Sequence, residues 1–311
     1  MPLATNYARV LLLSAPVYLL LQGSGAMVRA EGFPKRILWA MVLANVLNLG
    51  MDVLFIQVFH WGIAGAGWAT TISNIIALVI ILTRPRHSTT SILSAHIHLR
   101  LLPSILLAGA PIALGSVAMF VRLSYLTSAT SAHLGAKGMI TLSLLLSVFL
   151  VVNLLAGGTT QALQPLAGQY IGQGDTAAMY RTCRRSLRFT AISSVVVTLV
   201  VIVLARPLCL LYGIDSLPEA GTLSALRIFA LCYAFYSVGY VLMVIHQILG
   251  NKTKAMIIAV VQALMVIPVF ALALTFDSRL TWWAFPVSEL ISLIFISILS
   301  NHELRHIYTT P

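Results

Sequence analysis

The sequence predicts an all-α integral membrane protein, for three reasons. Its 311 residues are 59% hydrophobic and only 9% charged, with a mean hydropathy of +0.96. A soluble domain carries about a quarter charged residues, so this composition argues against a soluble fold. The apolar residues form runs long enough to cross a bilayer, and the basic residues gather in alternate loops between those runs.

Nine apolar segments are long enough for a helix to cross about 30 Å of hydrocarbon. No cleavable signal pattern precedes the first of them, so we expect that segment to be retained as a span. The predicted spans are residues 9–31, 37–59, 63–83, 103–124, 138–158, 187–206, 222–247, 255–276 and 281–300.

The lysine and arginine residues sort unequally between the two sides that these spans define. One side receives thirteen: Arg29, Lys35, Arg36, Arg84, Arg86, Arg100, Arg181, Arg184, Arg185, Arg188, Lys252, Lys254 and Arg305. The other receives four: Arg9, Lys137, Arg206 and Arg279. The positive-inside rule makes the first side cytoplasmic, so we expect a multi-pass protein of the inner (plasma) membrane with a cytoplasmic C-terminus. The net charge of +11 therefore gives no reason to expect a nucleic-acid partner, and we expect membrane lipids as partners instead.

The spacing of spans indicates an internal repeat. Gly32 and Gly250 each follow an apolar span and precede basic residues and another span, and their separation of 218 overlays the first three spans on the last three. The second lobe starts near Leu101, and subtracting 218 gives −117, so we expect three spans of the first lobe to be absent. The predicted organisation is a partial N-terminal lobe at 1–84, a cytoplasmic linker at 85–102 and a six-helix C-terminal lobe at 103–311. Repeated lobes are typical of secondary transporters.

Asp52 is a carboxylate inside the second predicted span, one helical turn after Asn48. An ionisable group at membrane depth is costly and marks an ion or substrate path by default. The i, i+4 spacing places the Asn48 amide and the Asp52 carboxylate on one helix face. The alternative is a structural acid capped by Asn48 and a water.

Several motifs, in order, resemble the multidrug and toxic compound extrusion (MATE) family. Arg29-Ala-Glu-Gly-Phe-Pro-Lys35, Asn48-Leu-Gly-Met-Asp52 and Gly62-Ile-Ala-Gly-Ala-Gly-Trp-Ala-Thr70 resemble its spans four to six. Gln164-Pro-Leu-Ala-Gly-Gln-Tyr-Ile-Gly-Gln-Gly-Asp175 and Trp283-Ala-Phe-Pro-Val-Ser-Glu289 resemble motifs of the second lobe. The resemblance implies a two-lobe MATE-like bundle of nine transmembrane helices here, three of the first lobe and six of the second.

The resemblance also implies a function. It implies antiport efflux of drugs or toxic organic compounds by alternating access, coupled to H⁺ or Na⁺ and without another cofactor. The family's first-lobe ion site matches Asp52, Asn48 and Gln22 here, although for Gln22 a plain interhelical hydrogen bond is an equal alternative. Where some members carry a second-lobe glutamate, this sequence has Met119.

The second lobe offers weaker candidates for a substrate cavity. Glu289 is an intramembrane acid that follows Pro286, and functional and structural interpretations of it are balanced. Tyr233, Tyr236 and Tyr240 lie on one side of a span, either as core residues or as an aromatic wall for small organic cations. Arg122 and Arg227 could bind an anionic substrate, but we expect them to snorkel to the membrane interface.

The sequence shows no nucleophile–base pair, phosphate loop or metal spacing, so we predict no enzyme activity, no catalytic residues and no metal site. Two alternatives to an efflux antiporter remain. One is a flippase for lipid-linked saccharides, which would need several basic residues along its cavity. The other is a non-functional or split fragment that needs a separate segment supplying three helices.

Overall fold

A computed structural model of the chain describes residues 2–83, 99–213, 220–276 and 280–309. Nearly all of this described part is helical, and it contains no strand. The chain divides into two compact units, Met1–Ile97 and His98–Pro311. That division falls inside the 85–102 segment, whose residues up to 98 lie outside the described part. Each unit is considered by itself.

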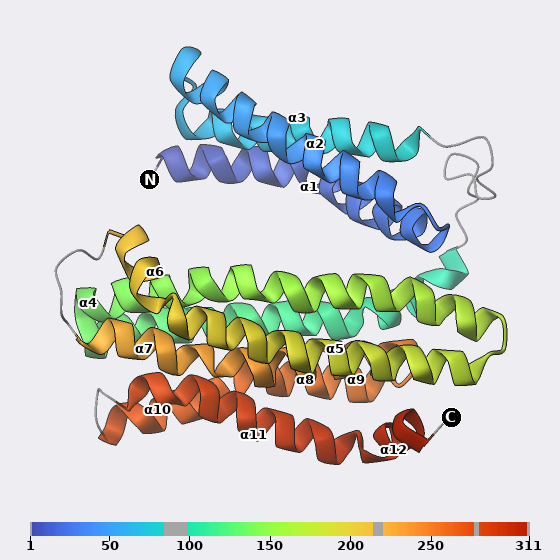
Figure 1. Cartoon of the computed structure of the whole chain (residues 1–311). Helices are drawn as coiled ribbons and strands as arrows, with labels where there is room; N and C mark the ends of the chain where they lie inside the picture. The colour runs from blue at the N-terminus through green and yellow to red at the C-terminus, as the bar shows by residue number, and fades with distance from the viewer. Residues whose placement is uncertain (1, 84–98, 214–219, 277–279, 310–311) are drawn as a thin grey trace. The chain divides into compact units, whose positions relative to one another are not determined.

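The first unit is built from three helices, shown in Figure 1 as α1 (Pro2–Ala30), α2 (Pro34–Val53) and α3 (Gly62–Leu82). A π-helical turn, η1 (Leu54–Val58), extends α2 and begins two residues after Asp52. Small side chains let the helices pack closely, and the buried cluster consists of Leu21, Val28, Ile37, Ala40, Ala44, Ala77, Leu78 and Ile81.

The same turn ends α1 in the first unit and α8 (Cys232–Ile248) in the second. Gly32 has φ +90° and Gly250 has φ +78°, a left-handed conformation that glycine adopts without strain. The Phe33 amide donates to the Val28 carbonyl, and the Asn251 amide donates to the His246 carbonyl. Each bond in the first turn has its counterpart 218 residues later, which is the offset of the predicted repeat.

In each unit, a basic side chain that follows the turn also donates to a carbonyl at the end of the third helix of the repeat. That helix is α3 in the first unit and α11 (Ala284–Leu299) in the second. Arg36 donates from Nε and Nη2 to the Ile80 carbonyl at 3.0 and 2.7 Å. Lys254, 218 residues later, donates to the Leu299 carbonyl at 3.2 Å. Carbonyls in the last turn of a helix lack intrahelical partners, so a cation there satisfies them and complements the helix dipole. The repeat therefore extends from span spacing to individual hydrogen bonds.

The 71 residues of α4 (Leu102–Gly172) form two helices rather than one. A straight helix of that length would measure roughly 105 Å, several times the thickness of a bilayer. Gly135, with φ 61° and ψ −156°, breaks the helical path, and Figure 1 shows the chain doubling back. The predicted spans 103–124 and 138–158 are the N-terminal parts of these two antiparallel helices.

The rest of the second unit continues the up-and-down path. One break has a clear local cause: Pro268 lacks the amide hydrogen that would bond to Leu264, and α9 ends at Leu264. The remaining elements are α5 (Thr176–Val203), α6 (Ala205–Leu211), α7 (Ala220–Ala230), α9 (Lys252–Leu264), α10 (Val266–Phe276), η3 (Thr281–Trp283), α11 (Ala284–Leu299) and α12 (Asn301–Thr309).

Within the described part, seven helical stretches are long and apolar enough to cross a membrane. They overlap eight of the nine predicted spans, because α4 overlaps two, and the remaining span, 9–31, overlaps α1. Large apolar side chains such as Phe120, Leu150 and Val203 are exposed on the outer faces of these helices. Such surfaces suit lipid rather than water. The chain is therefore a multi-pass membrane protein, and the predicted fold class is confirmed.

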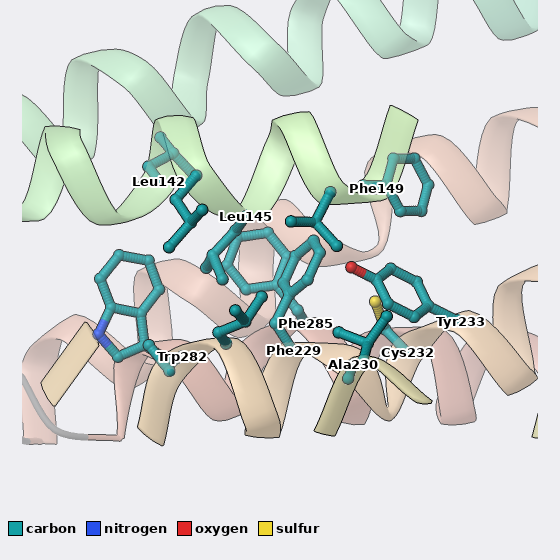
Figure 2. Packing of buried hydrophobic residues seen from close by; sticks show 14 of the residues in the cluster. Leu142, Leu145, Phe149, Phe229, Ala230, Cys232, Tyr233, Trp282 and Phe285 are labelled. Carbon is teal, nitrogen blue, oxygen red and sulfur yellow. The ribbon is translucent and has the colours of Figure 1, made fainter. Parts of the chain in front are cut away.

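An aromatic core holds the second unit together. Figure 2 shows Leu142, Leu145 and Phe149 of α4 facing Phe229 of α7 and Tyr233 of α8. The Phe149 and Phe229 ring centroids lie 6.2 Å apart in an edge-to-face arrangement. Edge-to-face contacts fix ring orientation as well as burying apolar area. This core positions α4 and α8, which line the cavity described below.

Candidate ion and substrate sites

Asp52 lies on α2, half-buried, just before the π-helical turn. Its Oδ1 is shielded from solvent and has no hydrogen-bond partner among the described residues. Leaving such an oxygen unpaired costs free energy. Its repeat counterpart, 218 residues later, is the fully buried Phe270. The equivalent position of the second lobe therefore accommodates an apolar residue.

Asn48 contacts α3 rather than Asp52. Its Nδ2 donates to the Thr70 hydroxyl at 3.3 Å, and that hydroxyl donates to the Ala66 carbonyl at 3.0 Å. The amide donor is thus engaged between helices. The structure assigns no direct hydrogen bond between Asn48 and Asp52.

Gln22 lies on α1 with its side chain exposed. Its Nε2 donates to the Tyr18 hydroxyl, one turn earlier on the same helix, at 2.9 Å. Neither this bond nor the bond of Asn48 joins Gln22 to Asn48 or Asp52, and the three residues remain candidates for one site rather than an assembled one.

Arg122 does not snorkel to the interface, and that expectation was wrong. Its side chain is 3% exposed, and Nη1 donates to Oε1 of Glu289 at 3.3 Å. Glu289 is itself 2% exposed, so the pair is shielded from solvent on both sides. The Arg122 guanidinium stays buried because it pairs with the buried carboxylate of Glu289. Arg227, which is not buried in this way, is exposed.

Glu289 sits in the first two turns of α11, and Pro286 sits in its first turn. A proline there removes no intrahelical hydrogen bond, so it does not open the helix as it would in the interior. The pairing leaves two buried polar atoms without partners among the described residues, Nε of Arg122 and Oε2 of Glu289. One bond thus satisfies only part of each charged group.

A cavity of about 360 Å³ opens beside Arg122 in the second unit. Its charged, amide and phenolic lining residues are Arg122, Asn153, Tyr236, Tyr240 and Gln262. The other lining residues, from α4, α8 and α9, are Pro111, Ile112, Gly115, Ser116, Met119, Met243, Ala259 and Ala263.

The three tyrosines that were predicted to lie on one side of a span occupy two different environments. Tyr233 is fully buried in the aromatic core and is absent from the cavity lining. Tyr236 and Tyr240 line the cavity, with ring centroids 6.1 Å apart and planes inclined by 13°. Asn153 lines the cavity together with both rings.

Sequence reasoning missed two cavity residues, Asn153 and Gln262. Gln262 is buried and donates from Nε2 to the Tyr236 carbonyl at 2.7 Å. Gly239 makes room for it, because a Cβ there would lie 2.6 Å from that nitrogen. The available signal was a polar amide inside an apolar run, the kind of residue that bonds across helices at membrane depth.

No group of three or more histidine, cysteine, aspartate or glutamate side chains that could hold a metal ion occurs in the described ranges. The three cysteines, Cys183, Cys209 and Cys232, are buried and free.

Comparison with known proteins decides the family. The MatE family model matches residues 111–272, just over half of the chain. The chain belongs to the MatE family. The match covers the two helices of α4 and the cavity-lining parts of α8 and α9, so the cavity lies within the MatE segment.

Two curated relatives share part of this sequence. The uncharacterized transporter YisQ of Bacillus subtilis (strain 168) is 26% identical over 170 residues, which cover 52% of this chain and 37% of that protein. Protein DETOXIFICATION 44, chloroplastic, of Arabidopsis thaliana is 31% identical over 138 residues, which cover 44% of this chain and 26% of that protein. The chain thus spans roughly a quarter to two fifths of the length of these MatE-like relatives.

Solved MATE structures share the fold over the whole chain. The crystal structure of MATE in complex with MaL6 has a TM-score of 0.88 at 20% identity, covering 98% of this chain and 70% of that one. The outward-facing conformation of a multidrug resistance MATE family transporter of the MOP superfamily has a TM-score of 0.87 with the same coverage. The MatE assignment made from sequence motifs is confirmed, and the fold is that of a MATE transporter.

Proposed function

We propose that this chain forms part of an efflux antiporter that exports small toxic organic compounds by alternating access, driven by H⁺ or Na⁺. MatE membership and the MATE fold support transport. The observation that carries the ion coupling is the Oδ1 atom of Asp52, shielded from solvent and without a partner among the described residues.

An unpaired carboxylate oxygen at membrane depth has two ways to be satisfied. It can bind a proton, which removes the charge, or it can ligate a hard cation such as Na⁺. The Asn48 amide donor is engaged with Thr70, so its amide oxygen is the atom of that side chain left for a cation. Gln22 is proposed as a further polar group of the same ion site.

Binding of the ion would change the charge of α2 next to a π-helical turn. Such turns are often found at functional sites in helices. A proton or Na⁺ that neutralises Asp52 has a different free energy in two helix arrangements and so can shift their populations. This is the two-state element that alternating access requires.

We further propose that a separate segment, on this or another polypeptide, supplies three helices to the first unit. The support is that the chain covers 70% of each matched MATE structure while those structures cover nearly all of it. The proposed membrane is the plasma membrane with the C-terminus in the cytoplasm. Supporting this, Arg184 donates to the Tyr308 carbonyl and Arg188 lies over the Tyr308 ring, so basic residues gather around the C-terminal helix.

The flippase alternative is less well supported. It would need several basic side chains to hold a pyrophosphate, and among the residues lining the described cavity only Arg122 is basic, already paired with Glu289.

Transport can be tested in proteoliposomes that contain the chain together with a three-helix segment. We expect ethidium export to follow an imposed pH or Na⁺ gradient and to stop when an ionophore collapses that gradient. Export that continues unchanged without any ion gradient would refute cation coupling, and the absence of export in the completed protein would refute the efflux function.

A further inference from the structure

We propose that the cavity in the second unit binds a small aromatic carboxylate through Arg122. This names a ligand class for the second-lobe cavity, distinct from the cationic compound ethidium that tests the proposed function, and it rests on that function for its meaning in the cell. Binding itself can be measured without transport, so the two claims can fail separately.

Arg122 lines the cavity and has unused hydrogen-bonding capacity. It is the one charged side chain among the residues lining the described cavity, and it is 3% exposed. Glu289 accepts from Nη1 only, and Nε has no partner among the described residues. A guanidinium presents five donors in a fork that matches the two oxygens of a carboxylate. A ligand carboxylate would satisfy donors that the protein leaves unpaired.

The cavity wall opposite the charge suits an aromatic ring. Tyr236 and Tyr240 present two nearly parallel rings, and Met119 and Met243 add polarisable apolar surface. Aromatic pairs prefer offset or edge-to-face contact, and thioethers also contact ring edges favourably. The volume of about 360 Å³ is near the lower limit of small-molecule sites, roughly 300 Å³, which favours a compact ligand.

The charge distribution argues against an organic cation in this cavity. Glu289 could attract a cation, but it is not among the lining residues and lies beyond Arg122, which contacts it. An incoming cation would therefore meet the guanidinium first. A ligand carboxylate would be attracted to the Arg122 guanidinium but would compete with Glu289 for it. We therefore expect weak binding that strengthens when Glu289 loses its charge.

The test is equilibrium binding of radiolabelled benzoate at pH 7 to the 311-residue chain in phosphatidylcholine nanodiscs. We expect specific binding to the unmodified chain and about tenfold tighter binding to Glu289→Gln, because Arg122 then keeps its charge but loses its competitor. Excess benzoate should compete, whereas benzamide and benzylammonium should not. Benzoate should also raise the thermal unfolding midpoint of Glu289→Gln.

Two further variants separate recognition from folding. The double variant Glu289→Gln, Arg122→Gln has a neutral pair of similar size and should bind no benzoate. Arg227→Gln removes an exposed arginine outside the cavity and should bind like the unmodified chain. The proposal is overturned if folded Glu289→Gln binds no more tightly than the unmodified chain, or if benzamide competes as well as benzoate. If the completed transporter exports no ethidium while the chain still binds benzoate, only the proposed export function is contradicted.

Discussion

At the scale of single residues, the Arg122–Glu289 pair shows what could not be read from the sequence. The partners are 167 positions apart, and either one alone is compatible with a membrane interface. Only the packing of α11 against the unit reveals that the charges meet. By contrast, Asp52 stood out in the sequence because a carboxylate in an apolar run is unusual whatever its neighbours.

Removing one partner of this pair should destabilise the protein more than removing both. Arg122→Met alone leaves Glu289 buried and uncompensated, which costs about 3–5 kcal/mol in comparable cases. Arg122→Met combined with Glu289→Leu replaces the pair by apolar side chains and should recover much of that loss. The measurement is the thermal unfolding midpoint in detergent. If the double variant loses as much stability as Arg122→Met alone, or as the two single changes added together, the two side chains do not stabilise the protein as a pair.

At the scale of helices, the predicted spans coincide with the observed ones in their central parts but not at their ends. The predicted loop after residue 124 is helical as far as Leu134, because no glycine or proline interrupts the chain between Gly115 and Gly135. The predicted apolar span ended at residue 124, but local backbone chemistry decided where the helix stopped.

Gly135 should be irreplaceable where other α4 glycines are not. Its φ of 61° and ψ of −156° fall in a region that is almost restricted to glycine and costs other residues about 1–3 kcal/mol. Gly135→Ala should therefore lower the thermal midpoint although a Cβ meets nothing within 4 Å. The matched control is Gly157→Ala in the same element, where space is also open and the backbone is helical. A neutral Gly135→Ala, or an equal loss at Gly157, would contradict this account.

A polar clasp joins the ends of α9, α11 and α12. Oε1 of Glu303 accepts from Nζ of Lys254 at 2.6 Å and from Nδ2 of Asn251 at 3.1 Å. Burial alone would raise the pKa of Glu303, but the hydrogen bond from Lys254 and the nearby positive charges outweigh it and lower the pKa below 4.5. A lowered acid pKa stabilises the fold above the unfolded-state value and ceases to do so as the pH falls through the folded-state value.

The lowered pKa of Glu303 leads to a prediction about how thermal stability depends on pH. The unmodified chain should have a higher thermal midpoint than Glu303→Gln at pH 6, and this advantage should disappear as the pH is lowered below about 4.5. Parallel melts in detergent between pH 6 and pH 3 would measure it. A difference that stays constant over this range would mean that the charge of Glu303 does not stabilise the clasp.

At the scale of the whole molecule, composition and motif order were enough to predict the fold class and the family. The repeat was also visible, and its matching turns at Gly32 and Gly250 give it a structural basis. Sequence could not show which polar residues share a cavity, since Asn153, Tyr236 and Gln262 come from three different helices. Periodicity places residues on faces, whereas tertiary packing determines which faces meet.

The proposed three-helix segment leads to a prediction about transport. Cells that produce only the 311-residue chain should export ethidium no faster than cells with an empty vector, whereas cells that also produce the segment should export it. The reason is that α1–α3 alone leave Asp52 without the helices that would enclose an ion site. Energy-dependent export by the chain alone would show that no further segment is needed.

The central claim is that Asp52 couples ion movement to export, and Asp52→Asn in the completed transporter tests it most directly. Asparagine preserves the size of the side chain but neither ionises nor binds a proton, and Asp52→Glu serves as the control that keeps the carboxylate. Ethidium export would be followed in proteoliposomes under imposed pH and Na⁺ gradients, with insertion verified by protease protection. We predict that Asp52→Asn inserts normally but loses gradient-driven export, while Asp52→Glu retains part of it. Export by Asp52→Asn at the normal rate and with the normal dependence on both gradients would contradict the claim.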